Sequence, residues 1–287
     1  MEITPSGKPQ GVGLTAAYLT ARTSSFVDFL RAEAPDLLPS RRLVPEGVLG
    51  KGSLDVPHGT TVVALVFKGG VLIAGDRRAT SGNLIAYNTM DKVYVTDSYS
   101  AAGIAGSAGI GVELLRLYQV QLQHYEKIEG LSLSLDGKAN QLASMVRGNM
   151  EMAMAGLVAV PLFVGYDTEA ANPDKAGRIV SFDVSGGRFE EQSGYHGIGS
   201  GSLFAKSSLK KTFDPDADMD TAIRKAIEAL YDAADEDSAT GGPDVARKIY
   251  PTVVTVTGLD GAVKLSDARA AEVAEAVVAD RMANPRG

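Results

Sequence analysis

The sequence predicts an α+β protein in which two antiparallel sheets face each other and helices cover the outside. The first observation is a pair of β-branched, apolar runs, 61–67 and 71–74, joined by Lys68-Gly69-Gly70. Two such runs around a Gly-Gly turn indicate a hairpin. The second observation is that strand-like segments come in groups and helical segments in pairs. A doubly wound parallel sheet would instead alternate single strands with single helices.

The remaining elements follow from apolar periodicity and from glycine, proline and capping residues. After a loop at 79–90, the expected strands are 92–96, 100–105, 157–166, 178–183, 188–195, 253–257 and 263–265. The expected helices are 107–128, 136–155, one that ends near Lys211, one capped by Asp220, and 267–282. Two successive helices with a short loop are expected to pack as an antiparallel pair.

The first 59 residues differ from the rest of the chain. They are rich in Pro, Gly, Ser and Thr, and they hold six basic and six acidic residues, so the net charge of −7 lies in residues 60–287. Their composition alone fits either a tail with one docking helix or a propeptide that is removed. The sequence that follows Gly59 favours the propeptide. We therefore expect residues 1–59 to be a propeptide and residues 60–287 to be the catalytic domain.

Composition excludes several classes of function. The acidic balance, with a pI of about 5.1, argues against a nucleic-acid partner. The chain has no cysteine, and its three histidines are too scattered for a zinc site, so we expect no metal and no cofactor. No apolar run reaches membrane-spanning length, and the start lacks the pattern of a secretory signal. We expect a cytoplasmic protein without a membrane partner.

Two common kinds of catalytic or ligand site are disfavoured by the motifs. Only His196 could serve a Ser-His-Asp triad, and no G-x-S-x-G turn accompanies it. The glycine-rich segments 103–111 and 197–202 match neither nucleotide-binding pattern, G-x-G-x-x-G with a downstream acid or G-x-x-x-x-G-K-[ST].

An N-terminal threonine would supply both a nucleophile and a base. If the chain were cut between Gly59 and Thr60, the α-amine, with a pKa of about 7.7 to 8.0 against about 10.4 for lysine, could take up the hydroxyl proton near neutral pH. Lys92 would favour the alkoxide, Asp76 would orient Lys92, and the N–H of Gly106 could bind an oxyanion. Taken singly, these four residues are more typical of a strand threonine, an edge lysine, a turn aspartate and a helix-entry glycine.

Taken together, they carry a family resemblance. From Gly59 to about residue 265 the sequence resembles proteasome core-particle β-subunits of the actinobacterial type, which are N-terminal-nucleophile threonine peptidases. The matching stretches are GTTVVAL, AGDRRAT, DKVYVTD, GIAGSA, GIGSGS and DSATGGPD. The resemblance implies a four-layer αββα sandwich. It places the nucleophile on Thr60, the carboxylate on Asp76, the lysine on Lys92 and the oxyanion donor on Gly106. The supporting residues fall on Ser200, Asp237 and Thr240, where Thr240 stands in place of the family's more usual serine.

The resemblance also implies an activity and partners. The activity would be ATP-independent cleavage of unfolded proteins in a closed chamber, after autocatalytic cleavage between Gly59 and Thr60. The partners would be copies of the chain in seven-membered rings, α-subunit rings, a ring-shaped ATPase, and substrates tagged by a small ubiquitin-like protein. The residues expected to line the substrate pocket are small or apolar, which predicts cleavage after apolar residues: Ala79, Thr80, Met90, Ile104 and Ala108.

Two alternatives stay open at this point. The first is the related bacterial two-component protease, which also begins with Thr-Thr but is shorter and lacks a long propeptide. Asp76-Arg77-Arg78 and the C-terminal extension disfavour it. The second is a non-catalytic structural ring subunit, which the joint presence of Thr60, Asp76 and Lys92 disfavours.

Overall fold

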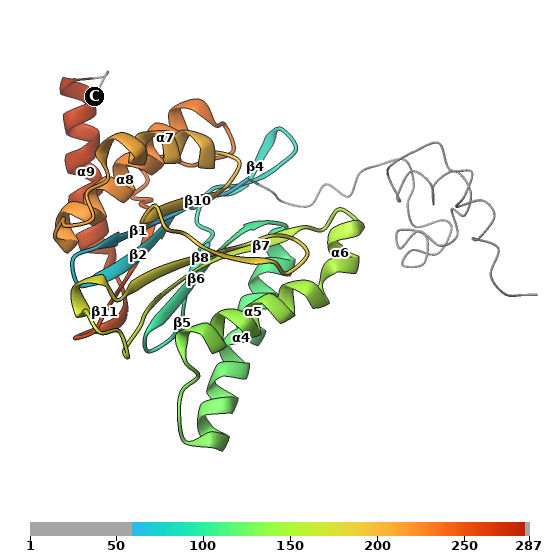
Figure 1. Cartoon of the computed structure of the whole chain (residues 1–287). Helices are drawn as coiled ribbons and strands as arrows, with labels where there is room; N and C mark the ends of the chain where they lie inside the picture. The colour runs from blue at the N-terminus through green and yellow to red at the C-terminus, as the bar shows by residue number, and fades with distance from the viewer. Residues whose placement is uncertain (1–58, 285–287) are drawn as a thin grey trace, which may run out of the picture. The chain divides into compact units, whose positions relative to one another are not determined.

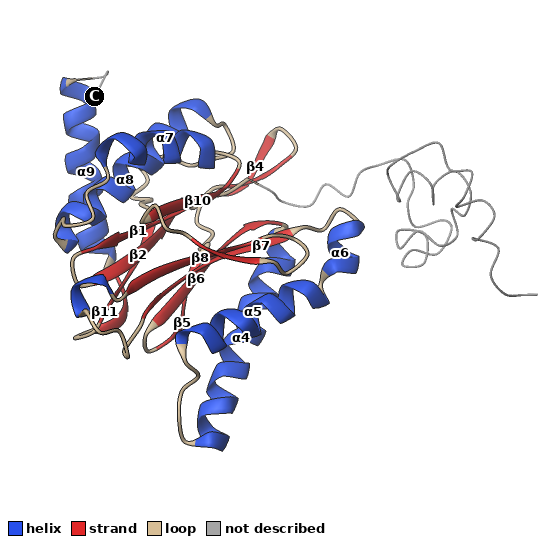
Figure 2. Ribbon diagram, in the orientation of Figure 1, coloured by secondary structure: helices blue, strands red, loops and turns tan. Residues whose placement is uncertain are grey.

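A computed structural model of the chain describes residues 59–284. Within them, two five-stranded sheets are antiparallel throughout (Figures 1 and 2). The first has the order β10 (Tyr195–Gly199), β1 (Thr61–Phe67), β2 (Gly70–Gly75), β11 (Thr252–Thr257) and β12 (Gly261–Lys264). The second has the order β5 (Val93–Asp97), β6 (Ser100–Gly106), β7 (Ala159–Tyr166), β8 (Gly177–Phe182) and β9 (Arg188–Glu190).

The helices form the two outer layers, as Figure 1 shows. The first sheet is covered by α7 (Ser202–Thr212), α8 (Met219–Glu236) and α9 (Asp267–Ala283). The second is covered by α4 (Ala108–Glu129) and α5 (Leu135–Gly148), with α6 (Met150–Met154) following α5. A 3-10 turn, η2 (Pro173–Lys175), and a small hairpin of β3 (Ala79–Ser81) and β4 (Leu84–Tyr87) complete the described elements.

Three separate cores explain the layer order. Along β1, Val62 and Ala64 point between the sheets, whereas Val63 and Leu65 point toward α7 and α8. Because both faces are buried, the strand reads as an almost continuous apolar run rather than an alternating one. The second sheet divides in the same way, with Leu162 between the sheets and Phe163 against α4 and α5. The predicted α+β sandwich, in the four-layer αββα form, is confirmed.

The hairpin of β1 and β2 positions the functional residues. Val62 lies opposite Gly75 in this pair, so the residues before Val62 lie beside those after Gly75. On its other side β1 pairs with β10, where Thr61 lies opposite Gly199. The start of β1 is thus held between the end of β2 and the end of β10.

Several predicted boundaries differ from the structure. The single strand expected at 188–195 is two strands, β9 and β10, which belong to different sheets. The chain turns between them at Gly194, whose φ of 78° lies in the left-handed region that glycine tolerates. The helix expected at 136–155 is interrupted at Asn149. Asp218, not Asp220, caps α8 by accepting the N–H of Thr221.

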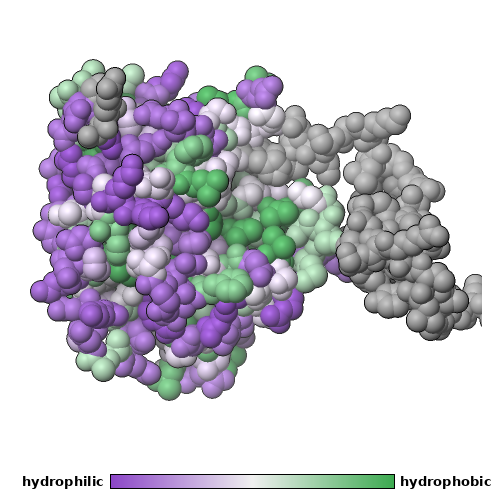
Figure 3. Space-filling model, turned by 45° about the horizontal axis from the view of Figure 1, so that its top comes forward, coloured by the Kyte–Doolittle hydropathy of each residue, from purple (hydrophilic) through white to green (hydrophobic). Residues whose placement is uncertain are grey.

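The face of the molecule that Figure 3 shows is largely hydrophilic and carries hydrophobic patches. Leu117 of α4 is 51% exposed. Among the other exposed apolar side chains are Leu84 and Tyr87 of β4 and Val120 of α4. None of the helices between residues 59 and 284 combines the length and the apolar character that a membrane span requires.

Candidate active site

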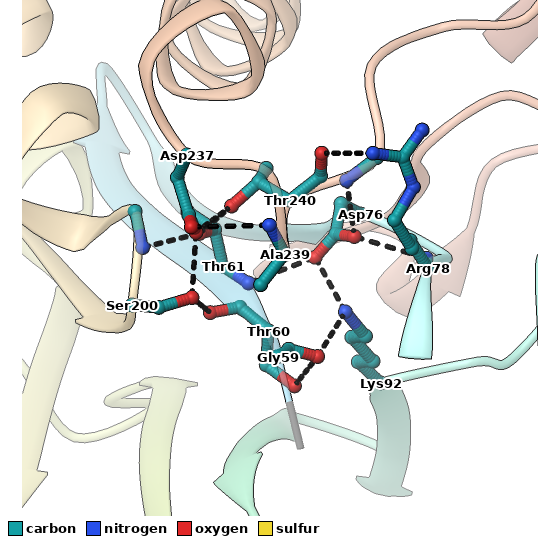
Figure 4. Close-up of polar contacts among 12 residues, drawn as sticks. Gly59, Thr60, Thr61, Asp76, Arg78, Lys92, Ser200, Asp237, Ala239 and Thr240 are labelled. Atoms are coloured by element: carbon teal, nitrogen blue, oxygen red, sulfur yellow. Dashed lines mark hydrogen bonds and ion pairs between the residues drawn. The ribbon is translucent and has the colours of Figure 1, made fainter. Parts of the chain in front are cut away.

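The candidate site surrounds the peptide bond between Gly59 and Thr60 (Figure 4). Thr60 is buried, and its Oγ1 donates a hydrogen bond to the carbonyl oxygen of Gly59 at 2.6 Å. The Nζ of Lys92 donates to the same oxygen at 3.0 Å. One carbonyl therefore faces both a hydroxyl and an ammonium group. This is the arrangement that polarises a carbonyl toward attack by a nearby hydroxyl.

Lys92 forms a buried ion pair with Asp76. The Nζ–Oδ1 distance is 2.6 Å, and the two side chains are 1% and 0% exposed. The same carboxylate accepts the backbone N–H groups of Thr61 at 2.8 Å, Arg78 at 2.9 Å and Gly241 at 2.8 Å. Burial lowers the pKa of Lys92, and the attraction of Asp76 opposes that shift without cancelling it. The ordinary interpretation of Lys92 as a solvated edge residue is wrong, because the side chain is fully enclosed.

A second carboxylate, Asp237, lies on the other side of Thr60. Its Oδ2 accepts the hydroxyls of Ser200 and Thr240, both at 2.6 Å, and its Oδ1 accepts the N–H of Ala239 at 3.1 Å. Burial alone would raise the pKa of Asp237, but these hydrogen bonds and the charge of Lys92 outweigh it and lower the pKa. The N–H of Ser200 also binds the carbonyl oxygen of Thr60 at 2.9 Å.

Glycine is required at two positions that shape the site. Gly59 has a φ of 98°, and a Cβ there would lie 2.5 Å from Oγ1 of Thr80 and 2.9 Å from Cβ of Ala239. Gly199 has a φ of 96°, and its Cβ would lie 1.9 Å from the carbonyl oxygen of Thr60. Both backbones lie too close to their neighbours for any side chain.

The structure brings together six of the seven residues predicted to be catalytic. On one side, Thr60 and Lys92 both donate to the carbonyl oxygen of Gly59, and Lys92 also donates to Asp76. On the other side, hydrogen bonds connect Thr60 with the remaining three: Ser200, Asp237 and Thr240. Gly106 ends β6, which pairs with the strand that follows Lys92. Its φ is 107°, and a Cβ there would lie 2.1 Å from the carbonyl oxygen of Val158. Its part as an oxyanion donor stays a prediction.

The residues predicted to bind substrate have different surroundings. Met90 and Ala108 line a hollow of about 1120 Å³, together with Tyr87, Val112 and Leu117. Thr80 lies beside Gly59, as the close approach of its Oγ1 shows, and Ala79 is buried at the start of β3. Ile104 is buried in the core between the second sheet and α4, where it packs against Gly111. Their contacts with substrate stay predictions.

Two neighbours of the site, Thr61 and Arg78, lie in the matching stretches GTTVVAL and AGDRRAT, but no role was predicted for either. Thr61 hydrogen-bonds to Asp76 through its N–H, and its Oγ1 lies 2.6 Å from Oγ1 of Thr240. Arg78 donates to the carbonyl oxygens of Ser238 at 3.0 Å and Thr240 at 3.2 Å, and so ties the end of β2 to the loop after α8. The contacts with Ser238 and Thr240 join residues 160 to 179 positions apart in the sequence, so no local pattern reveals them. Among the described residues, no cluster of His, Asp or Glu could hold a metal ion.

Comparison with known proteins gives a consistent family match. A family model described as "Proteasome subunit" matches residues 56–247. A protein named proteasome subunit beta from Saccharopolyspora erythraea is 63% identical over 277 residues, covering 96% of each chain. One from Saccharomonospora viridis is 63% identical over 287 residues, covering 99% of each chain. One from Rhodococcus erythropolis is 61% identical over 278 residues, covering 96% of this chain and 95% of its own.

Proposed function

The chain belongs to the proteasome subunit family, and we propose that it is a catalytic β-subunit of the core particle, acting as a threonine endopeptidase with Thr60 as its N-terminal nucleophile. The observation that carries this proposal is the environment of the carbonyl group of Gly59. A threonine hydroxyl lies 2.6 Å from its oxygen, and a buried lysine, paired with a buried aspartate, lies 3.0 Å from it.

The precursor is inactive toward other substrates because the nitrogen of Thr60 is part of an amide. An amide nitrogen has no free lone pair with which to accept the hydroxyl proton. Once the bond to Gly59 is broken, the α-amine becomes the general base on the same residue as the nucleophile. Lys92 then stabilises the developing alkoxide, and Asp76 holds Lys92 in place. The N–H of Gly106 serves as the oxyanion donor.

Self-cleavage uses the same hydroxyl. Oγ1 of Thr60 adds to the carbonyl carbon of Gly59, and the hydroxyl proton is passed to the departing nitrogen. The C–N bond breaks, which leaves an ester between Gly59 and Oγ1 and a free amine on Thr60. Water then hydrolyses the ester, giving a carboxylate on Gly59 and restoring the hydroxyl. The ammonium group of Lys92 stabilises the negative charge on the carbonyl oxygen during addition. Residues 1–59 are thus a propeptide, and residues 60–287 form the mature chain.

Membership of the family means assembly into the proteasome core with other subunits. We propose seven-membered rings of this chain stacked between rings of α-subunits, in the cytoplasm, with a ring-shaped ATPase that delivers substrates carrying a small ubiquitin-like tag. Exposed apolar side chains such as Leu84, Tyr87 and Val120 support such contacts, because clustered exposed apolar surface is typical of interfaces. Residues Ala79, Thr80, Met90, Ile104 and Ala108 are assigned to the pocket that selects apolar side chains.

The test is peptide hydrolysis by the full-length chain expressed together with its α-subunit. We expect the wild type to cleave fluorogenic peptides with an apolar residue before the scissile bond, and Thr60→Ala to be inactive in rings of the same size. Thr60→Ser keeps the hydroxyl and should retain part of the activity. Assembled wild-type rings without any activity would instead favour a non-catalytic structural subunit. Equal activity in the wild type and Thr60→Ala would place the nucleophile elsewhere.

A further inference from the structure

Thr61 contacts the hydrogen-bond networks of both carboxylates in the site. It is fully buried. Its N–H donates to Oδ1 of Asp76 at 2.8 Å, and its Oγ1 lies 2.6 Å from Oγ1 of Thr240, which in turn hydrogen-bonds to Asp237. Figure 4 shows Thr61 between these two groups.

The direction of the hydroxyl chain follows from counting protons. Asp237, as a carboxylate, can only accept, so the single hydroxyl proton of Thr240 is used in the 2.6 Å bond to its Oδ2. In the contact between Thr61 and Thr240, the donor must therefore be Thr61. Oγ1 of Thr61 itself accepts the N–H of Gly201 at 3.1 Å. The hydrogen bonds are thus donated in one direction: from the N–H of Gly201 to Thr61, from the hydroxyl of Thr61 to Thr240, and from the hydroxyl of Thr240 to Asp237.

The local packing leaves the hydroxyls of Thr61 and Thr240 little room to move. A Cβ on Gly201 would lie 2.5 Å from Oγ1 of Thr61 and 2.6 Å from Oγ1 of Thr240. The backbone of Gly201 therefore closes directly over the two hydroxyls. Hydrogen bonds that follow one another in this way polarise each other, so the donor at the start of the chain strengthens the bond at its end.

We propose that Thr61 is a positioning residue for the reaction and that it acts through its hydroxyl. It fixes the orientation of the hydroxyl of Thr240, and through it the carboxylate of Asp237 and the hydroxyl of Ser200, beside the amine that Thr60 gains on cleavage. This inference rests on the proposed threonine-peptidase function. It assigns the second residue of the mature chain a part in catalysis although that residue does not touch the substrate.

The experiment compares Thr61→Val with Thr61→Ser in the full-length chain, expressed with its α-subunit. Valine keeps the shape but removes the hydroxyl, which leaves Thr240 without its donor and the N–H of Gly201 without its acceptor. We expect kcat for a fluorogenic peptide to fall roughly tenfold, the effect of one well-positioned hydrogen bond, with KM within about twofold of wild type. Thr61→Ser should restore kcat to within about threefold. Thr240→Val added to Thr61→Val should cost little more than Thr240→Val alone.

The matched control is Thr96→Val. Thr96 is also buried, and its Oγ1 lies 2.7 Å from Oγ of Ser100, but this pair belongs to the second sheet. Its loss should leave kcat unchanged. A wild-type kcat in Thr61→Val, or equal losses in the Val and Ser variants, would overturn the inference. If the Val chain fails to assemble, Thr61→Ala against Thr61→Ser makes the same comparison. An inactive wild type would contradict the proposed function itself, so the two failures are distinguishable.

Discussion

Replacing Gly59 by alanine tests whether the geometry of the junction drives self-cleavage. The backbone of Gly59 has a φ of 98°, and a Cβ there would lie 2.5 Å from Oγ1 of Thr80 and 2.9 Å from Cβ of Ala239. The left-handed conformation costs alanine about 1 to 3 kcal/mol, and the overlap adds about 1 to 3 kcal/mol. Turning the carbonyl group of Gly59 away from Thr60 and Lys92 would relieve this strain at the cost of the contacts that favour cleavage.

The rate of self-cleavage should fall accordingly. A penalty of about 2 to 6 kcal/mol on the productive conformation corresponds to roughly 30- to 30,000-fold slower cleavage. The assay is a time course of the intact mass of newly assembled protein. Gly69→Ala is the matched control: Gly69 has a φ of 85° in the turn between β1 and β2, and its added Cβ would meet nothing within 4 Å. Its cleavage rate should stay within about threefold of wild type. Cleavage of Gly59→Ala at the rate of the control would refute the reasoning.

Three further variants test the electrostatics and the pocket. Lys92→Met should abolish peptide hydrolysis and destabilise the subunit by about 3 to 5 kcal/mol, because it leaves Asp76 buried without its partner. Thermal unfolding of the assembled variant measures the loss of stability, and an unchanged melting temperature would contradict the prediction. The pKa of Asp237 is lower in the folded chain than in the unfolded chain, so between these two pKa values the unfolded state binds more protons. The stabilisation from the Asp237 carboxylate is therefore complete above pH of about 4, near the unfolded pKa, and is lost as pH falls through the folded pKa. The stability advantage of wild type over Asp237→Asn should therefore shrink when unfolding is followed below pH of about 4, and a gap independent of pH would speak against this account. Ala108→Trp should fill part of the hollow that Ala108 lines, and it should raise KM more for peptides with a large apolar residue than for peptides with a small one. An equal change in KM across the peptide panel would argue against a substrate pocket there.

The part of the site formed by the first hairpin could be predicted from the sequence. A Gly-Gly turn between two apolar runs sets β1 against β2, so the start of β1, next to Thr60, lies beside Asp76. The burial of Lys92 could not be predicted in the same way, because a lysine at the start of a strand is usually solvated. Only its pairing with Asp76, which depends on the packing of the two sheets, makes burial tolerable.

The second half of the site depends on long-range pairing. Ser200 reaches Thr60 because β10 pairs with β1, and the sequence pattern instead predicted one strand through 188–195. Asp237 follows α8, whose position depends on its packing against the first sheet. Neither contact leaves a local signature, so both residues were placed only by resemblance to a family. Neither local patterns nor the family resemblance predicted the hydrogen bond between Thr61 and Thr240, because strand threonines are common and the sequence does not show where their hydroxyls point.

The central claim, that Thr60 is the nucleophile of a self-processing peptidase, is tested most directly by intact mass. The full-length wild type and Thr60→Ala are each expressed with the α-subunit, and the mass of each chain is measured after assembly. We predict a wild-type chain that begins at Thr60 and a Thr60→Ala chain that still carries residues 1–59. A Thr60→Ala chain cut at the same bond, or a wild-type chain left at full length in assembled rings, would contradict the claim.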